Sequence, residues 1–474
     1  MRTYVPPEGS IPTLPIPSLS GIGSVHLIGV GGAGMRNLAR LMQARGIGVS
    51  GSDLKDSKGL AELREAGADV WVGHDPARFD SPDVVIVSSA ISPTNPELRA
   101  ATERGIPVWA RQQALAALVE GTRAVAVAGT HGKTTTTSMI AVVLERIGLD
   151  PSYLIGGDLN ESGSGARSGR GELFVFEADE SDGSFLLARP SVGVVTNVDV
   201  DHVDFYPGGS DEIEAAFGRF VSSCEQVVAC GDDPGVRSVL ADTGTSALRY
   251  GTATDLDLLV TVDELGPDGA RGRVRDRSGA EAPLRLRVDG LHNLLNAAAA
   301  VGVAGIVGVP LAEAAEAVGA YTGVHRRFEH RGSARGADFF DDYGQTPVEM
   351  AVTIETARRR RPGRVIALVQ PHRYWRVQAL WRELGASVTG ADLVLVTDVY
   401  GAAQEPIPGV TGRLVVDGVS LASPATPAVY LPHRADVVDY LDREVREGDL
   451  VITMGCGDVW MLGDAALARI GGQE

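Results

Sequence analysis

The sequence contains few cysteines, no long apolar run and no leader-like N-terminus. Its three cysteines, Cys224, Cys230 and Cys456, show no metal-ligand spacing, which argues against a cysteine-held metal and suits a reducing compartment such as the cytoplasm. No apolar run reaches about 18 residues, so a membrane span is not expected. Residues 1–20 carry five prolines without a basic segment followed by an apolar one, which predicts a flexible arm and not a signal peptide.

Positive charge is also scarce. The 43 Lys and Arg residues are outnumbered by 61 Asp and Glu residues, which gives a formal net charge of −18. Such a chain lacks the basic surface that nonspecific binding to nucleic acid or to an anionic membrane requires. An anionic small molecule would have to be held locally by a few cations, backbone N–H groups or Mg²⁺.

The length of 474 residues exceeds what one hydrophobic core fills, so two or three domains are expected. Three segments alternate short β-rich runs with helical periods, which is typical of parallel α/β sheets. We predict a Rossmann-like domain at residues 21–120, a central P-loop ATPase domain with a mainly parallel sheet at 121–327, and a C-terminal Rossmann-like α/β domain at 328–474. Within the central segment, the stretch near 256–290 looks antiparallel, and the polar, glycine-rich residues 266–282 predict a hairpin or loop.

Only three lysines occur in the chain, and one of them lies in a glycine-rich turn. Residues 124–128 are apolar, 129–132 read Gly-Thr-His-Gly, and Lys133 precedes an apolar-periodic segment. In such a strand–turn–helix, backbone N–H groups and the helix N-terminus cradle phosphates. Lys133 would contact the outer phosphates, and Thr134 could offer its hydroxyl to a phosphate-bound Mg²⁺. A compact ammonium fits among phosphate oxygens where a guanidinium would not, which favours a nucleotide site over a structural helix start.

A second glycine-rich turn follows the first expected strand. Residues 29–35 read Gly-Val-Gly-Gly-Ala-Gly-Met, and Asp53 follows about twenty residues later, where it would suit a ribose hydroxyl. The fingerprint favours a nucleotide or nucleotide-sugar without preference for NAD, with a purely structural turn as the alternative.

Acidic residues follow two further apolar runs of the central segment. Glu177 begins the run Glu-Ala-Asp-Glu-Ser-Asp, and Asp201 and His202 follow the run that ends at Asn197. Carboxylates at the C-terminal end of a buried strand are what a hard Mg²⁺ ion requires. We expect Glu177 to hold Mg²⁺, and His202 to ligate a second ion or orient a ligand. The alternatives are a solvated acidic loop and a structural histidine.

Arginines and aromatic residues mark the last segment. The run His-Arg-Arg-Phe at 325–328 lies at a predicted domain junction, where an arginine can close over a phosphate as domains move. Asp342 and Tyr343, and then the run at 370–376, each follow an expected strand. The second run gathers cations and aromatic rings in a loop that could bind a carboxylate, with a solvated loop as the alternative.

Taken together, these motifs resemble the Mur ligases. The matching residues follow the family order over nearly the whole chain after residue 20: they are 29–35, 50–53, 129–138, 177–182, 201–202, 292–293, 326–328, 370–374 and 405–410. They are most similar to the members that join L-alanine to UDP-N-acetylmuramate. The resemblance implies an ATP- and Mg²⁺-dependent ligase of peptidoglycan precursor synthesis. In that reaction the muramyl carboxylate becomes an acyl phosphate, which the amino group then attacks.

The resemblance also implies a role for each site residue, with the uridine nucleotide in the first domain, ATP in the second and the amino acid in the third. The expected catalytic residues are Lys133, Glu177, His202 and Arg326, and the expected metal ligands are Thr134, Glu177 and His202. The expected ATP-binding residues are Gly129, Thr130, His131, Gly132, Lys133, Thr134, Thr135, His292, Asn293, Asn296 and Arg327. The expected substrate-binding residues are Gly31, Gly32, Ala33, Gly34, Met35, Ser52, Asp53, Ser88, Ser89, Asp342, Tyr343, His372, Arg373 and Arg376. A monomer or weak homodimer is expected.

Several residues depart from the family pattern, and most of them fall around the acceptor. Gln345 and Thr346 stand where a His-His pair is usual, Trp375 stands where a small Ser is usual, and Cys456 interrupts a Gly-Ala-Gly-Asp-like run. Residues 36–37 are Arg-Asn where Ser-Gly usually follows the methionine. These changes leave open a ligase that uses another amino acid or acceptor in a specialised pathway.

Two further alternatives belong to other classes. A nucleotide-binding regulatory protein without ligase chemistry would keep the phosphate loop, whereas an NAD-dependent oxidoreductase would leave Lys133, Glu177 and His202 unexplained. No lysine follows Lys133, which excludes the carbamylated lysine of several sister ligases. Phosphate release that requires both an acceptor and an amino acid separates a ligase from both alternatives.

Overall fold

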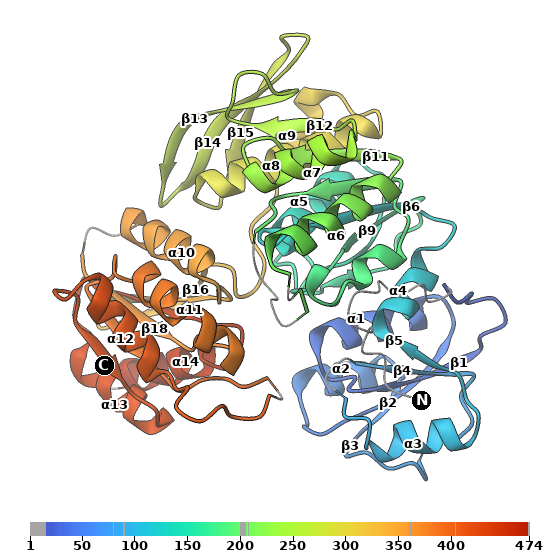
Figure 1. Ribbon diagram of the computed structural model, residues 1–474, viewed down its shortest axis with the longest axis horizontal. Helices are drawn as coiled ribbons and strands as arrows, with labels where there is room; N and C mark the ends of the chain where they lie inside the picture. The colour runs from blue at the N-terminus through green and yellow to red at the C-terminus, as the bar shows by residue number, and fades with distance from the viewer. Residues whose placement is uncertain are drawn as a thin grey trace. The chain divides into compact units, whose positions relative to one another are not determined.

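The computed structural model describes residues 16–78, 80–88, 91–199, 205–206, 208–360, 363–402 and 404–472. The chain divides into two compact units. Met1–Asp263, Ala270–Arg287 and Leu291–Thr322 form the first, and Glu264–Gly269, Val288–Gly290 and Gly323–Glu474 form the second. Three sheets, mostly parallel and with helices packed on them, confirm the predicted α/β class (Figure 1). Of the predicted arm at residues 1–20, residues 1–15 lie outside the described part of the chain.

The first sheet is parallel throughout, in the order β3-β2-β1-β4-β5. Its strands are β1 (Ser24–Ile28), β2 (Gly48–Asp53), β3 (Asp69–Val72), β4 (Val84–Val87) and β5 (Val108–Ala110). Side chains alternate along β1, so Val25 and Leu27 pack in one cluster with α1 (Ala33–Ala44), α2 (Lys58–Glu65) and α4 (Arg111–Val119), whereas Ile28 packs with α3 (Pro96–Glu103). The glycine turn leaves β1 where the strand order reverses, which is the ligand crevice of this architecture.

The central sheet has the order β15-β14-β13-β12-β11-β10-β6-β9-β7-β8. Its strands are β6 (Arg123–Ala128), β7 (Ser152–Leu154), β8 (Ala166–Arg167), β9 (Leu173–Glu177), β10 (Val192–Val195), β11 (Gln226–Cys230), β12 (Leu248–Gly251), β13 (Leu258–Gly266), β14 (Gly269–Asp276) and β15 (Glu281–Leu286). β6 lies between β9 and β10 and is parallel to both. The antiparallel pair β14–β15 confirms the antiparallel character expected near 256–290 and the hairpin predicted within 266–282.

Helices flank the central sheet. α5 (Lys133–Arg146), α8 (Leu291–Ile306) and α9 (Leu311–Val318) pack against one another, and α6 (Ser210–Ser223) packs against α7 (Pro234–Thr243) (Figure 1). Ala124, Ala126 and Ala128 of β6 share one apolar core with Phe217 and Phe220 of α6. That core continues into the first sheet, so the two sheets of the first unit are joined by buried apolar contact.

The second unit holds a six-stranded sheet in the order β16-β17-β21-β18-β19-β20, parallel except for the pair β16–β17. Its strands are β16 (Glu329–Ala334), β17 (Ala337–Asp342), β18 (Val365–Val369), β19 (Leu393–Val396), β20 (Ala428–Tyr430) and β21 (Leu450–Met454). One face packs against α10 (Pro347–Arg360), α11 (Tyr374–Ser387) and α12 (Arg413–Ala422), and the other against α13 (Arg434–Glu444) and α14 (Trp460–Gly471).

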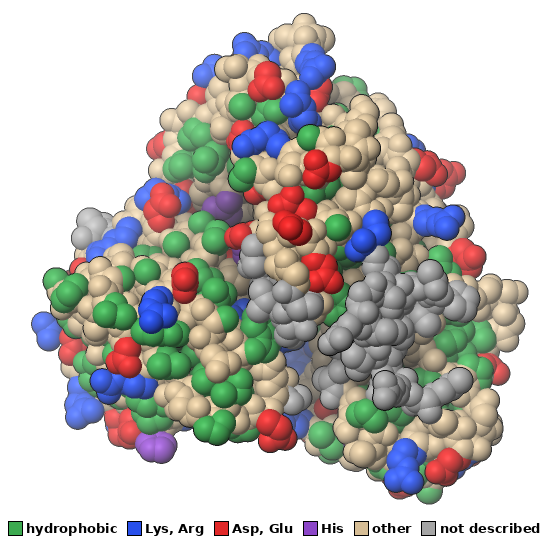
Figure 2. Space-filling model, viewed as in Figure 1, with side chains coloured by type: hydrophobic (Ala, Val, Ile, Leu, Met, Phe, Trp, Pro, Cys, Tyr) green, Lys and Arg blue, Asp and Glu red, His purple; other side chains and the backbone are tan. Residues whose placement is uncertain are grey.

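The surface carries both signs of charge. On the face shown in Figure 2, acidic and basic side chains are interspersed over both units. Among the described residues, no helix combines the length and the apolar character that crossing a membrane demands.

Candidate functional site

The glycine-rich loop at residues 129–132 joins β6 to α5 at the carboxyl edge of the central sheet. Gly129 has a φ of +139°, and a Cβ there would lie 2.0 Å from Thr196 Oγ1. Gly132 precedes α5 in the left-handed conformation, with a φ of +78°. The loop path therefore needs glycine at both positions, and it directs the first N–H groups of α5 toward the space where phosphates would bind.

The segment that follows β10 braces this loop. Asn197 Oδ1 accepts a hydrogen bond from the His131 N–H at 2.8 Å, and its Nδ2 donates to the His131 carbonyl at 3.0 Å. Thr130 Oγ1 accepts from the Asp199 N–H at 2.9 Å, and Thr196 Oγ1 donates to the His131 carbonyl at 2.6 Å. The sequence reasoning gave Asn197 no role, although its place directly after an apolar strand was the available signal.

Lys133, the first residue of α5, lies over the loop. Its Nζ donates to the two carboxylate oxygens of Glu180 at 2.8 and 2.9 Å and to the Gly129 carbonyl at 2.7 Å. The Glu180 side chain is 4% exposed and that of Lys133 is 16% exposed. Burial lowers the pKa of Lys133, but the charges of Glu180 and Asp179 raise it by more, so the net pKa lies above its ordinary value. Lys133 is therefore a cation at neutral pH.

Glu177 ends β9, the neighbour of β6 in the sheet. Its Oε1 accepts a hydrogen bond from the Gly156 N–H at 2.5 Å. The carbonyl of the same peptide group, which belongs to Ile155, accepts one from Nδ2 of the fully buried Asn37 at 3.2 Å. A single peptide unit thus connects helix α1, next to the first glycine turn, with the Glu177 carboxylate.

The oxygen donors near the loop suit Mg²⁺ that is bound together with phosphates. Thr134 brings a hydroxyl in the first turn of α5, and Glu177 brings a carboxylate at an adjacent strand end. Among the described residues, no group of three or more His, Cys, Asp or Glu side chains is placed to hold a metal ion. Mg²⁺ commonly takes one or two carboxylates and completes its coordination with phosphate oxygens and water, so this donor set fits a nucleotide-bound ion. The expected second position, Asp201-His202, lies outside the described residues.

The start of α8 lies beside the phosphate loop. Asn296 is buried, and its Oδ1 accepts a hydrogen bond from Thr136 Oγ1 of α5 at 3.1 Å. The same oxygen would lie 3.2 Å from a Cβ on Gly132. Asn293 is buried and His292 is exposed one turn earlier. The three residues thus stand on a helix that contacts the loop, and their part in ATP binding stays a prediction.

The first glycine turn is organised by Asp53. Its Oδ2 accepts a hydrogen bond from the Gly31 N–H at 2.9 Å, and its Oδ1 accepts one from the Lys55 N–H at 3.1 Å. A Cβ on Gly31 would lie 2.9 Å from this carboxylate, so the close approach needs glycine. Gly32 and Ala33 are exposed where α1 begins. Asp53 holds the turn here, and its contact with a ribose stays a prediction.

Two expected substrate residues of the first sheet are buried. Met35 lies in the core, and Ser52 is completely buried, with its hydroxyl 2.8 Å from His74 Nδ1 and hydrogen-bonded to Glu97. Neither side chain reaches the surface, and their assignment to a substrate site stays a prediction. Ser88 is half-buried after β4, and Ser89 lies outside the described residues.

Arg326 holds together the carboxyl edge of the six-stranded sheet. Its guanidinium donates to Asp341 Oδ2 at 2.9 Å and to the carbonyls of Gly455 and Gly457 at 2.6 and 3.1 Å, and it lies over the Tyr343 ring. Burial raises the pKa of Asp341 although the charge of Arg326 lowers it. Much of the donor capacity of Arg326 is engaged inside the second unit. Its expected contact with phosphates, and that of Arg327, stay predictions.

The residues expected to bind the amino acid meet at the same edge. Arg376 is 1% exposed, and its Nη1 donates to Gln345 Oε1 at 3.0 Å and to His372 Nδ1 at 3.3 Å. The Cys456 thiol donates to the same Gln345 oxygen at 2.8 Å, and burial raises the pKa of Cys456 to about 12. Since arginine only donates, the Gln345 carbonyl must face Arg376 and its NH₂ must face away. Arg373, with a φ of +66°, precedes α11.

Asp342 lies beside this cluster and shapes the turn after β17. Its carboxylate accepts hydrogen bonds from the N–H groups of Phe328 and Gly344, both at 2.8 Å. Burial raises the pKa of Asp342 although the charge of Arg327 lowers it. Burial raises the pKa of the neighbouring Tyr343 to about 12.

Models of one family match three consecutive parts of the chain. They are described as the Mur ligase family, catalytic domain (residues 24–123), the Mur ligase middle domain (127–304) and the Mur ligase, glutamate ligase domain (326–457). The chain is also 45% identical over 460 residues to the UDP-N-acetylmuramate–L-alanine ligase of Acidothermus cellulolyticus, which covers 96% of this chain and 94% of that relative. The chain belongs to the Mur ligase family.

Other relatives of this Mur ligase agree with that membership. The UDP-N-acetylmuramate–L-alanine ligase of Kineococcus radiotolerans is 45% identical, with 95% of this chain and 97% of the relative covered. The crystal structure of the UDP-N-acetylmuramate–alanine ligase of Thermotoga maritima superposes with a TM-score of 0.82 at 26% identity, covering 95% of this chain and all of that one. A murein peptide ligase from Psychrobacter arcticus gives 0.74 at 25% identity, covering 95% and 99%.

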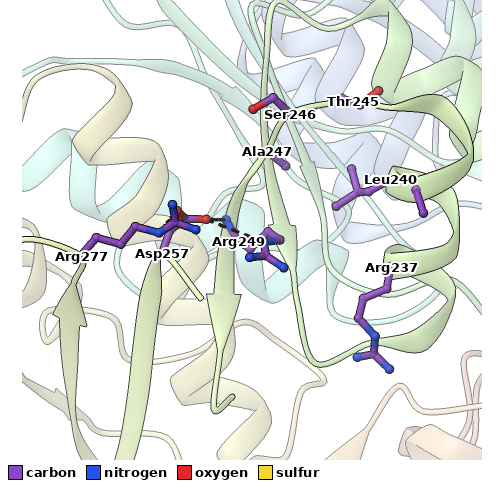
Figure 3. Close-up of a pocket in the computed structure, with 9 residues that line it drawn as sticks. Arg237, Leu240, Thr245, Ser246, Ala247, Arg249, Asp257 and Arg277 are labelled. Atoms are coloured by element: carbon purple, nitrogen blue, oxygen red, sulfur yellow. Dashed lines mark hydrogen bonds and ion pairs between the residues drawn. The ribbon is translucent and has the colours of Figure 1, made fainter. Parts of the chain in front are cut away.

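A separate hollow of this Mur ligase lies at the opposite, amino-terminal edge of the central sheet. Its volume is about 490 Å³, and its lining comes from the end of α7, the start of β12 and the β14–β15 turn (Figure 3). Arg249 and Arg277 lie 4.0 and 2.6 Å from Asp257, and Arg237 donates to the carbonyls of Gly231 and Asp232. These arginines already serve the local structure, so the hollow is not a ready anion site.

Proposed function

We propose that this protein joins L-alanine to the carboxylate of UDP-N-acetylmuramate at the expense of ATP, in the synthesis of peptidoglycan precursors. The phosphate loop carries the proposal: Lys133 begins α5 directly after β6, and Glu177 ends β9, which pairs with β6. The proposal is also supported by relatives of that name which match more than nine-tenths of this chain. We propose that the reaction takes place in the cytoplasm and that the enzyme is a monomer or weak homodimer.

The proposed reaction has two steps. ATP supplies the phosphoryl group that turns the muramyl carboxylate into an acyl phosphate, with Mg²⁺ neutralising charge on the phosphates. ADP leaves in that step. In the second step, the amino group of L-alanine attacks the acyl carbon, phosphate leaves, and the nitrogen loses a proton. The net products are the amide, ADP and phosphate.

Residues of this chain would bind the substrates and stabilise the negative charge of the phosphates in both steps. The loop N–H groups and Lys133 would hold the outer phosphates, while Thr134, Glu177 and His202 would hold the ion. Asn293 and Asn296 on α8 would lie toward the nucleoside, and the turn at residues 31–35 would hold the uridine nucleotide. In the second unit, His372, Arg373 and Arg376 would bind the carboxylate of the amino acid.

The experiment measures ADP, phosphate and the product mass with ATP, Mg²⁺, UDP-N-acetylmuramate and L-alanine. The proposal requires phosphate release only when both co-substrates are present, because phosphate leaves in the second step. Lys133→Ala should lower kcat by about 10²-fold or more, because a charge-assisted contact in the transition state is lost. Sustained phosphate release without an amino acid, or near-normal turnover of Lys133→Ala, would contradict it.

A second candidate is a ligase of this family with another amino acid. The contact of Gln345 with Cys456 and Arg376 favours it, because two residues that depart from the family pattern touch each other at the expected amino-acid site. A screen of amino acids in the same assay decides between the two. The expected assignment holds if L-alanine gives the highest kcat/KM.

A further inference from the structure

The Lys133 ammonium, the cation of the phosphate loop, already forms an ion pair with the Glu180 carboxylate of the same chain. The Lys133 ammonium has three N–H donors. They meet both oxygens of Glu180 at 2.8 and 2.9 Å and the Gly129 carbonyl at 2.7 Å, and the Thr130 carbonyl lies 3.4 Å away. A phosphate oxygen can therefore reach Nζ only by replacing one of these partners, and the only negatively charged one among them is Glu180.

Backbone hydrogen bonds fix the position of Glu180. Its carbonyl accepts a hydrogen bond from the hydroxyl of the buried Tyr206 at 2.7 Å. It opens a short 3₁₀ turn, Glu180–Asp182, which Asp179 caps by accepting from the Ser181 N–H at 3.2 Å. The Glu180 side chain is 4% exposed. Moving it away from Lys133 would leave a buried charge without its partner, which is costly.

We infer that Glu180 is a positioning residue that competes with the nucleotide phosphates for Lys133. The inference rests on the proposed function. In the free protein, Glu180 keeps the ammonium over the loop and neutralises it. When phosphates bind, the ammonium exchanges one anion for another. The contribution of Lys133 to the binding free energy of the nucleotide is therefore its interaction with the phosphate minus its interaction with the Glu180 carboxylate.

Competition between Glu180 and the phosphates predicts that removing the Glu180 charge strengthens ADP binding, whereas a substitution that only disrupts the site would weaken it. Glu180→Gln keeps the size of the side chain and one oxygen acceptor but removes the charge. Lys133 is then less strongly held, and a negative charge next to the phosphates disappears. We expect the Gln variant to bind ADP more tightly than the parent, by about tenfold or more. A role for Glu180 in supporting the fold alone would weaken binding or leave it unchanged.

The experiment is calorimetric titration of ADP and of adenosine into the full chain, without Mg²⁺ and with a chelator. ADP affinity should rise in Glu180→Gln, whereas adenosine affinity should stay the same because adenosine has no phosphates. Glu145→Gln is the matched control: Glu145 pairs with Arg167 at 3.1 Å near the other end of α5, and the substitution changes the net charge equally. It should not change the Kd for ADP.

A second pair of variants tests whether Glu180 acts through Lys133. In a Lys133→Met background, Glu180→Gln should change the ADP affinity much less than in the parent, because the group it competes for is absent. Glu180→Asp withdraws the carboxylate by one methylene and should shift the affinity in the same direction by a smaller factor. This variant carries the test if the Gln variant does not fold.

Unchanged or weaker ADP binding by Glu180→Gln, or an equal gain in the Lys133→Met background, would overturn the inference. A parent that binds no ADP either without Mg²⁺ or in a second titration with Mg²⁺ would instead refute the proposed function. The two failures are therefore distinguishable, since the first requires a parent that binds ADP.

Discussion

Replacing Gly129 by alanine tests whether the loop path is as constrained as its geometry indicates. An added Cβ would lie 2.0 Å from Thr196 Oγ1 and 3.2 Å from the backbone N and O of Asn197. Thr196 cannot simply rotate, because its hydroxyl donates to the His131 carbonyl at 2.6 Å. The φ of +139° is moreover a conformation that alanine rarely adopts.

The magnitude follows from two costs. Overpacking of this kind costs about 1–3 kcal/mol, and holding a non-glycine residue in such a backbone region costs about 1–3 kcal/mol. The sum, about 2–6 kcal/mol, would lower the melting temperature of the transition that includes this region by on the order of 10 °C. Gly132→Ala is the control: its φ of +78° is left-handed, and the atoms nearest to its Cβ would all belong to the Asn296 side chain, with Oδ1 at 3.2 Å. It should cost about 1–2 kcal/mol.

Differential scanning calorimetry measures both variants together with Gly129→Ala/Thr196→Ala. The double variant removes the oxygen that the new Cβ meets, and it should recover about 1–3 kcal/mol, the overpacking share of the loss. Equal destabilisation by Gly129→Ala and Gly132→Ala, or no recovery in the double variant, would refute the steric reasoning.

Three further predictions concern other parts of the molecule. Glu177→Ala should raise the Mg²⁺ concentration needed for half-maximal ADP release, and an unchanged Mg²⁺ dependence in a folded variant would remove the metal assignment. Burial raises the pKa of Glu97, but hydrogen bonds from His26, Ser52 and the Asp75 N–H and the electrostatic interaction with His26 together lower it by more, so its net pKa lies below the ordinary value. The stability it adds is therefore present above pH about 4.3 and is lost as pH falls through its folded pKa, so melting curves of the parent and Glu97→Gln should converge in acid. Restoring His at 345 and 346 and Ser at 375 should shift kcat/KM for L-alanine relative to glycine and L-serine by roughly tenfold to a hundredfold. Identical acceptor profiles would show that these departures do not affect specificity.

The sequence predicts the phosphate loop well because its signal is local. Strand, glycines, lysine and helix follow one another within about twenty residues, and the structure places β6, the loop and α5 in that order. The partners of the loop are not local. Glu180 is 47 residues from Lys133, and Asn197 is 66 residues from His131, so only the pairing of β6 with β9 and β10 brings them together.

The same limit applies to the residues expected to bind substrate. Ser52 follows the expected turn in sequence, but its side chain lies on the α3 face of β2, where it meets Glu97, 45 residues away. Gln345 and Cys456 are 111 residues apart and stand out in sequence only as separate departures. Their contact depends on the parallel neighbours β17 and β21, whose register a single sequence does not specify.

The peptide unit between Ile155 and Gly156 makes the hydrogen bond to Glu177 tolerant of substitutions at residue 155 and sensitive to substitutions at residue 156. Its two hydrogen bonds, from Asn37 and to Glu177, use backbone atoms, so a change of the residue 155 side chain leaves both in place. Any side chain at 156 would instead begin 2.9 Å from Glu177 Oε2. A bond donated to the carbonyl also strengthens the N–H of the same unit as a donor. A substitution at Asn37, in helix α1, therefore weakens a hydrogen bond to a carboxylate of the central sheet without any residue of that sheet having changed.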